Sequence, residues 1–243
     1  MRHVGAALVI LAMNSAVYGS TIIAYTSFEE PTTVSNTYYT DLGDASVDHA
    51  LVNHAGEPSV NYTSVGGELG FAASYINTRD DVGLTDGDYA GVSNYTGSVG
   101  SYTDGTQGYQ ISDADGMMQV ALDPVTLTGF SAYEVSVDVF VVSTGYETAP
   151  LDAMRVWATI DGTTEIDLLN TSPTDINDLG IEGAWMTLST PLVGSVATLS
   201  FSADTNSSYE AIFVDNVQFV GVPEPATMSL LCLGPLFLHT RRR

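Results

Sequence analysis

The chain has 243 residues, of which 44% are hydrophobic, so it can bury a core and is not intrinsically disordered. Its formal net charge is −23, and residues 20–222 hold 28 acidic residues against two basic ones, Arg79 and Arg155. Such a surface repels phosphate backbones, which excludes nucleic-acid binding. It suits either divalent cations or simple solvation of an acidic face.

Residues 1–19 are typical of a secretory signal peptide. A basic start precedes an apolar stretch from Val4 to Met13 and then small residues. The small side chains of Val17 and Gly19 predict cleavage between Gly19 and Ser20. We therefore expect the protein to be exported.

Residues 20–221 show the alternation of apolar and polar residues that predicts β-strands. Asp161-Gly162 predicts a hairpin turn. No segment keeps a 3.6-residue period, and no linker or repeat divides the region, so we expect one all-β domain, an antiparallel β-sandwich. The clearest strand segments are Tyr133–Val142, Met154–Ile160, Thr164–Leu169, Trp185–Leu188, Val196–Ala203 and Glu210–Val220.

Residues 80–116 are rich in Gly, Asp, Ser, Thr and Tyr, a composition typical of long loops and short strands. Asp86 with Asp88, and Asp113 with Asp115, place paired carboxylates beside glycines there. Because Ca²⁺ binds six to eight oxygen ligands, these four aspartates are candidates for a structural calcium site. The alternative is an Asx turn, in which each carboxylate accepts from its own backbone.

Sugar-binding surfaces stack pyranose rings on exposed aromatic side chains beside polar groups. Arg155 and Trp157 lie on the strand face opposite Val156, and Asp138 and Phe140 lie opposite the valine face of the preceding strand. We predict that Arg155, Trp157, Asp138 and Phe140 form one polysaccharide-binding platform. The alternative is a second layer of core beneath covering loops.

No catalytic residues are predicted. The chain has neither a G-x-S-x-G nor an H-E-x-x-H motif, and its one cysteine, Cys232, lies near the C-terminus. With so many acids, a pair of carboxylates carries no catalytic signal. His49 and His54 are expected to be loop residues, with a transition-metal site as the alternative.

The C-terminus has three parts, which are Val222-Pro223-Glu224-Pro225, an uncharged segment over 226–240, and Arg241, Arg242 and Arg243. This pattern resembles the PEP-CTERM sorting signal of Gram-negative envelope proteins. The resemblance implies that residues 222–243 hold the exported protein in the inner membrane by a short transmembrane helix, with the arginines cytoplasmic. It also implies the secretion machinery as a partner, and an exosortase-type protease that cuts near the Pro-Glu-Pro motif.

Two segments at the edges of the body resemble the first and last strands of jelly-roll carbohydrate-binding modules. They are Ala24–Glu30 and Ala211–Phe219. The resemblance implies a jelly-roll-like sandwich whose terminal strands lie side by side. It also implies a structural calcium ion held by Glu29 or Glu30 together with Asp215.

These features predict an exported, non-catalytic protein of the cell envelope, cell surface or extracellular matrix that binds polysaccharide or contributes to adhesion. One alternative is a structural matrix protein without a specific ligand. Another is a glycan-directed hydrolase on the same scaffold.

Overall fold

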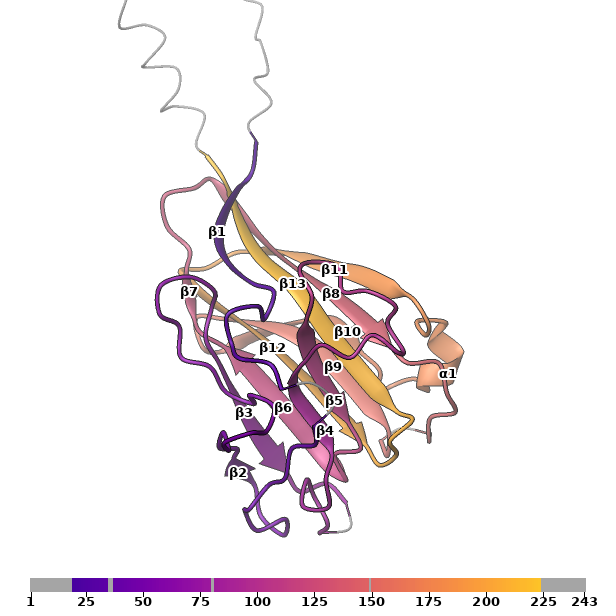
Figure 1. Cartoon of the computed structure of the whole chain (residues 1–243). Helices are drawn as coiled ribbons and strands as arrows, with labels where there is room; N and C mark the ends of the chain where they lie inside the picture. The colour runs from indigo at the N-terminus through magenta and orange to yellow at the C-terminus, as the bar shows by residue number, and fades with distance from the viewer. Residues whose placement is uncertain (1–18, 35–36, 80, 149, 224–243) are drawn as a thin grey trace, which may run out of the picture.

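The computed structural model describes residues 19–34, 37–79, 81–148 and 150–223, which form two antiparallel β-sheets packed face to face (Figure 1). We name each sheet after its central strand. The β13 sheet has the order β11-β8-β13-β5-β4, and β1 also pairs with β13. Its strands are β1 (Thr21–Thr26), β4 (Tyr89–Ser93), β5 (Gly108–Ser112), β8 (Ala132–Val141), β11 (Trp185–Leu192) and β13 (Ala211–Val222).

The β12 sheet has the order β10-β9-β12-β6-β3-β2, and β7 also pairs with β12. One short helix, α1 (Ile176–Leu179), precedes β11. The chain passes repeatedly from one sheet to the other, as in a jelly roll, so the predicted all-β, jelly-roll-like sandwich is confirmed. The strands of this sheet are β2 (His49–Ala50), β3 (Phe71–Ile76), β6 (Gly116–Leu122), β7 (Val125–Thr126), β9 (Ala153–Ile160), β10 (Thr164–Asn170) and β12 (Val196–Thr205).

The first and last strands lie side by side, as the resemblance implied. β1 pairs antiparallel with β13, and Thr21 is opposite Gly221. Both ends of the described chain therefore leave the sandwich at the same end (Figure 1).

The core lies between the two sheets, and the predicted strand faces supply it. Alternate residues of β8 and β9 point inward because successive side chains of a strand lie on opposite faces. Asp161 and Gly162, with φ of 49° and 70°, form the predicted turn between β9 and β10. The inward residues of these two strands are Tyr133, Val135, Val137, Val139 and Val141 of β8, and Met154, Val156, Ala158 and Ile160 of β9.

Four aromatic rings meet in the middle of this core. The ring of Phe28, which follows β1, lies 5.4 Å from the ring of Phe71, 5.6 Å from that of Tyr109 and 6.5 Å from that of Phe201. Each of these four side chains is buried. Because the rings come from four segments, they join the two sheets to the segment that follows β1.

A second apolar cluster covers the outer face of the β13 sheet. Phe140 of β8 and Phe213 of β13 pack there with Tyr102 and Trp185. Residues 94–107, between β4 and β5, reach this cluster, and the Trp185 indole N–H donates to the carbonyl of Ser101 at 2.8 Å. The outer faces of these two strands are thus partly a second core.

A buried charge network surrounds Arg79, which follows β3. Its guanidinium donates to Asp204 at 2.6 Å and to Asp152 at 2.8 Å, and both carboxylates are almost fully buried. Glu147 lies 3.4 Å away and is half exposed. Removing any one member of this network is expected to destabilise the fold, because it leaves a buried charge without an opposite charge.

Glu210 is a buried acid beside this network, and its burial raises its pKa to about 7. Asp152 and Glu147 raise this pKa further, whereas Arg79 and the hydrogen bond from the Asn206 N–H lower it. The folded state therefore binds a proton more tightly than the unfolded state does. The stability that this proton contributes is complete below about pH 4.5 and is lost as the pH rises through 7.

We expect Glu210→Gln to remove this pH dependence. At pH 8 the variant should be more stable than the parent by about 1–3 kcal/mol, and this advantage should disappear by pH 4.5. Urea unfolding of both proteins from pH 4.5 to 8 measures the difference. Parallel pH profiles for parent and variant would contradict the assignment.

The predicted ends of the chain lie mostly outside the described residues. Gly19 and Ser20 are exposed immediately before β1, and Pro223 follows β13. The remaining signal-peptide and sorting-signal residues, including Glu224, Pro225 and Arg241–Arg243, are not among those described. Within the described part of the chain, we find no helix with the length and apolar character needed to cross a membrane.

Candidate functional site

The four residues of the predicted platform do not lie together. Arg155 and Trp157 are on β9, in the β12 sheet, whereas Asp138 and Phe140 are on β8, in the β13 sheet. Both pairs point outward, as predicted, but from opposite sides of the sandwich. The prediction of a single platform is therefore wrong, because the chain changes sheets between β8 and β9.

Asp138 and Phe140 are held by the protein itself. Asp138 accepts a hydrogen bond from the Thr187 hydroxyl at 2.5 Å and another from the Asn216 side chain at 2.9 Å. Phe140 is buried in the second apolar cluster, against Trp185. Neither side chain offers a free surface to a sugar.

Trp157 projects from the expected side of β9, but its ring is covered. The Arg155 guanidinium carbon lies 4.6 Å from the ring centroid, and Trp157 is only 6% exposed. Arg155 is fixed there by hydrogen bonds of 2.7 Å to both Asp167 and Glu165. The arginine thus occupies the indole face on which a sugar ring would stack.

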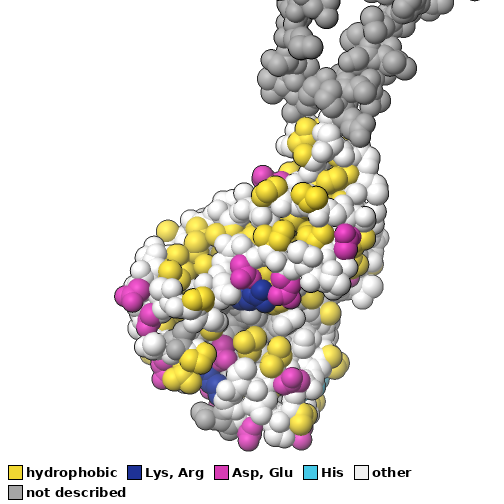
Figure 2. Space-filling model, turned by 180° about the vertical axis from the view of Figure 1, so that it is seen from behind, with side chains coloured by type: hydrophobic (Ala, Val, Ile, Leu, Met, Phe, Trp, Pro, Cys, Tyr) yellow, Lys and Arg dark blue, Asp and Glu magenta, His cyan; other side chains and the backbone are white. Residues whose placement is uncertain are grey.

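A hollow of about 360 Å³ lies beside this pair, on the outer face of the β12 sheet. Figure 2 shows the side of the molecule opposite to that in Figure 1, and the basic side chains visible on that side lie next to acidic ones. The hollow is polar and offers no open aromatic face. Its lining includes Met117, Gln119, Arg155, Trp157, Ser200 and Ser202.

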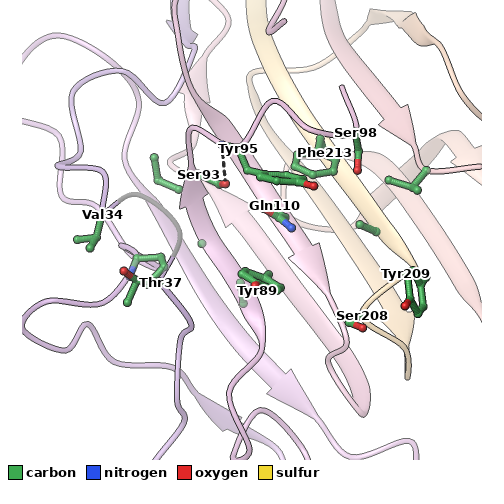
Figure 3. Close-up of a pocket in the computed structure, with 16 residues that line it drawn as sticks. Val34, Thr37, Tyr89, Ser93, Tyr95, Ser98, Gln110, Ser208, Tyr209 and Phe213 are labelled. Carbon is green, nitrogen blue, oxygen red and sulfur yellow. Dashed lines mark hydrogen bonds between the residues drawn. The ribbon is translucent and has the colours of Figure 1, made fainter. Parts of the chain in front are cut away.

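A second hollow, of about 350 Å³, lies on the outer face of the β13 sheet, over β4, β5 and the start of β13. We call it the tyrosine hollow, after Tyr89, Tyr95 and Tyr209 in its lining (Figure 3). Tyr95 and Tyr209 are exposed and Tyr89 is half-buried, so parts of their rings face solvent. The backbone N–H of Tyr95 donates to the Ser93 hydroxyl at 3.1 Å. This hydrogen bond helps to fix the start of the loop 94–107 between β4 and β5.

The tyrosine hollow has a polar floor without charge. Gln110 of β5 points into it between Tyr89 and Tyr95 (Figure 3). Its side chain is buried, and its amide makes no hydrogen bond to any residue that the structure describes. None of the lining residues is acidic or basic, although the chain carries 29 acids. The hollow can therefore hydrogen-bond a neutral ligand and pack against its apolar face.

The residues of the tyrosine hollow were not predicted from the sequence, although loops and short strands were expected in this part of the chain. One signal was present, because Tyr89 and Gly91 alternate with the core residues Ala90 and Val92 and so had to face outward. No local pattern could show that Tyr209, which comes much later in the chain, lies over the same strands.

Glu29 and Asp215 bind the same loop rather than each other. Glu29 accepts from the N–H groups of Thr106 and Gln107 at 2.6 and 2.8 Å. One oxygen of Asp215 accepts from the N–H groups of Thr103 and Asp104 at 2.7 and 2.9 Å. Burial raises the pKa of Asp215 to about 6 despite these donors. A cation shared by the two strands would have to compete with these N–H donors for the carboxylate oxygens.

The other predicted calcium ligands lie in different surroundings. Glu30 accepts a hydrogen bond from the Tyr62 hydroxyl at 2.5 Å. Asp86, Asp88 and Asp115 bring carboxylate oxygens within 4.8 Å of one another, whereas Asp113 is not part of this group. Burial, together with the neighbouring aspartates, raises the pKa of Asp88 to about 9.

The two histidines are loop or edge residues. His49 is hydrogen-bonded through Nε2 to the Asp41 carboxylate, and His54 stacks on Tyr39 with ring centroids 5.8 Å apart. The alternative of a shared transition-metal site has no support in these contacts.

No protein-family model matches the chain, and no curated protein matches it. The chain is similar to a solved adhesin domain of Lys-gingipain from Porphyromonas gingivalis, with 15% identity and a TM-score of 0.34 over 83% of this chain and 99% of that one. It is also similar to a xylan-binding domain from Paenibacillus barcinonensis, with 15% identity and a TM-score of 0.32 over 86% of this chain and 99% of the other.

A third similar structure is a carbohydrate-binding module in complex with β-1,4-galactotriose, with 12% identity and a TM-score of 0.37 over 54% of this chain and 81% of the module. At such TM-scores the functions of these proteins do not transfer to this chain. Its own residues have to carry any functional assignment.

Proposed function

We propose that this protein is an exported, non-catalytic protein that binds a neutral polysaccharide in the tyrosine hollow. The observation that carries the proposal is the uncharged, tyrosine-lined hollow around the Gln110 amide on a chain of net charge −23. The hollow is within the range of about 300–1,000 Å³ that is usual for ligand sites.

The chemistry of the lining suits a sugar. The C–H face of a pyranose ring is apolar and packs on the ring of Tyr95, Tyr89 or Tyr209, while the Gln110 amide can both donate to and accept from sugar hydroxyls. Because the Gln110 amide makes no hydrogen bond to the described residues, its donor and acceptor are available to a ligand with matching hydroxyls.

The charge of the chain supports a neutral ligand over an acidic one. A polysaccharide that carries carboxylates or sulfates would be repelled by the acidic surface, and most strongly at low salt. A neutral polysaccharide is not repelled in this way, and none of the residues that line the hollow carries a charge.

The proposed setting of this activity is the cell envelope, the cell surface or the extracellular matrix. Its support is the sequence at the two ends, a signal-peptide pattern and a sorting-signal pattern that implies processing by an exosortase. A polysaccharide-binding protein in that setting would contribute to adhesion.

The test is binding of the protein to soluble polysaccharides, measured by affinity electrophoresis and calorimetry. A β-1,4-galactan and a xylan are suitable first neutral ligands, and a polyuronate is the acidic comparison. We expect binding to at least one neutral polysaccharide. Replacing Tyr95 by alanine should weaken it about five- to tenfold, since an aromatic contact contributes about 1–1.5 kcal/mol.

Tyr25→Ala is the matched control, because Tyr25 is 42% exposed and Tyr95 is 45% exposed, but Tyr25 lies on β1 outside the hollow. It should leave the affinity unchanged. Equal effects of the two substitutions would place the ligand elsewhere. If no polysaccharide binds, the protein is better described as a structural matrix protein, and hydrolysis of any of them would show an enzyme.

A further inference from the structure

Asp88 is a buried carboxylate without a partner. Its side chain is 1% exposed, and both of its oxygens are buried without a hydrogen bond. Its backbone is fully used, since its N–H and C=O pair with those of Tyr39. Buried polar atoms nearly always have a partner, so these two oxygens need an explanation.

Two more carboxylates approach Asp88 from different segments. Asp86 lies two residues earlier, and Asp115 comes from the turn between β5 and β6, and one oxygen from each of the three lies within 4.8 Å of the others. Asp86 is exposed and Asp115 is half-buried, so the group is open to solvent on one side. Like charges at such distances repel one another unless a proton or a cation compensates them.

The spacing fits a calcium ion. Ca²⁺ binds oxygen at about 2.3–2.6 Å, so ligands on opposite sides of the ion are at most about 5 Å apart. Mg²⁺ demands near-ideal octahedral geometry, whereas Ca²⁺ accepts irregular sets of six to eight oxygens, so a group drawn from two loop segments favours Ca²⁺. Carboxylate oxygens are the ligands that hard divalent cations prefer.

We propose that Asp86, Asp88 and Asp115 bind a divalent cation, Ca²⁺, with backbone carbonyls and water completing its coordination. The ion would tie the segment before β4 to the turn between β5 and β6. Tyr89 of the tyrosine hollow directly follows Asp88, so the ion would also fix the start of that strand.

This position is distinct from the one that the sequence resemblance implied. Glu29 and Asp215 are occupied by N–H donors of one loop, whereas the oxygens of Asp88 are free of such donors. The cluster also lies at the far end of the sandwich from the chain ends, since Ser112 pairs with Ala211 while Thr21 pairs with Gly221.

The test uses the full chain, freed of metal by a chelator and then dialysed. Melting temperatures are measured with CaCl₂ and with NaCl at the same ionic strength, and calorimetry gives the affinity. We expect calcium at a hundredfold excess over Kd to raise the melting temperature by roughly 5–10 °C beyond the sodium effect. Asp88→Asn should lose this calcium-specific shift.

Asp88→Asn is expected to fold, because a neutral amide of the same shape replaces a buried carboxylate, and its melting temperature in chelator should be no lower than that of the parent. Asp86→Asn, at an exposed position, should weaken calcium binding at least about tenfold and serves as the deciding variant if Asp88→Asn does not fold. Asp178→Asn, at an exposed position on α1, should change nothing.

Three results would overturn the proposal. Equal responses to calcium and sodium would show screening of the acidic surface alone. Calcium-specific shifts that survive in both Asp86→Asn and Asp88→Asn would place the ion elsewhere. A shift lost in Asp215→Asn but kept in Asp88→Asn would place it between β1 and β13.

Discussion

Replacing Arg79 by methionine is expected to lower the free energy of unfolding by about 3–5 kcal/mol, because two buried carboxylates lose their counter-charge. For a domain of this size, such a loss lowers the melting temperature by roughly 6–20 °C. The effect should shrink at low pH, because burial raises the pKa of Asp152, which can then take up a proton. Denaturant unfolding at pH 7.5 and pH 5 measures both parts of this expectation.

Arg155→Met is the matched control, since these are the two arginines of the described chain. Arg155 is 31% exposed and also pairs with two acids, but near the surface, where ion pairs contribute about 1 kcal/mol or less. A further variant, Arg79→Met with Asp152→Asn and Asp204→Asn, should recover part of the loss. Equal losses in the two arginine variants would show that burial of the network has no energetic role.

Phe28→Ala is expected to cost about 3–5 kcal/mol, because it opens a cavity among Phe71, Tyr109 and Phe201 in the middle of the core. Phe28 also has a φ of 60°, a backbone conformation that non-glycine residues rarely adopt, so packing has to hold it in place. Thermal unfolding monitored by circular dichroism measures the change.

Ile22→Ala on β1 is the control, because Ile22 is exposed and its replacement should change stability by about 0.5 kcal/mol or less. Phe28→Leu should lose less than Phe28→Ala, since it leaves a smaller cavity. A loss below about 1 kcal/mol in Phe28→Ala would mean that the segment after β1 is not an integral part of the core.

The sequence was informative about the faces of individual strands. The alternation over β8 and β9 predicted which residues point inward, and the valines of β8 are buried as expected. The turn at Asp161-Gly162 was also predictable, because a tight hairpin needs residues that accept a positive φ. Both features depend on neighbours in the chain.

The partners of each strand could not be predicted in this way. The predicted platform assumed that β8 and β9 lie in one sheet, but β8 pairs with β13 and β11, and β9 pairs with β12 and β10. Strand pairing depends on contacts between residues far apart in the sequence, and alternation within one strand carries no information about them. Asp138 therefore faces outward as predicted, but it lies in a different sheet from Trp157.

For the candidate sites too, the sequence showed the residue types, whereas their grouping in space depends on contacts between distant parts of the chain. Composition and spacing identified Asp86, Asp88 and Asp115 as acids in loops, but only the fold shows that Asp88 is buried and that Asp115 reaches it. The tyrosine hollow likewise draws on separate segments, and Tyr209 joins it from the turn between β12 and β13.

The place of β13 in its sheet determines how the domain carries mechanical load. β13 pairs with β8 on one side and with β5 and β1 on the other, and Ala211 and Phe213, near its start, line the tyrosine hollow. A pull along the C-terminal end of β13, against a ligand held in the hollow, runs parallel to the strand. The hydrogen bonds of an antiparallel ladder lie perpendicular to the strands, so this pull loads many of them together in shear instead of opening them one at a time. Under the proposed function, this arrangement would let the domain resist force between a polysaccharide bound in the tyrosine hollow and the C-terminal end of β13.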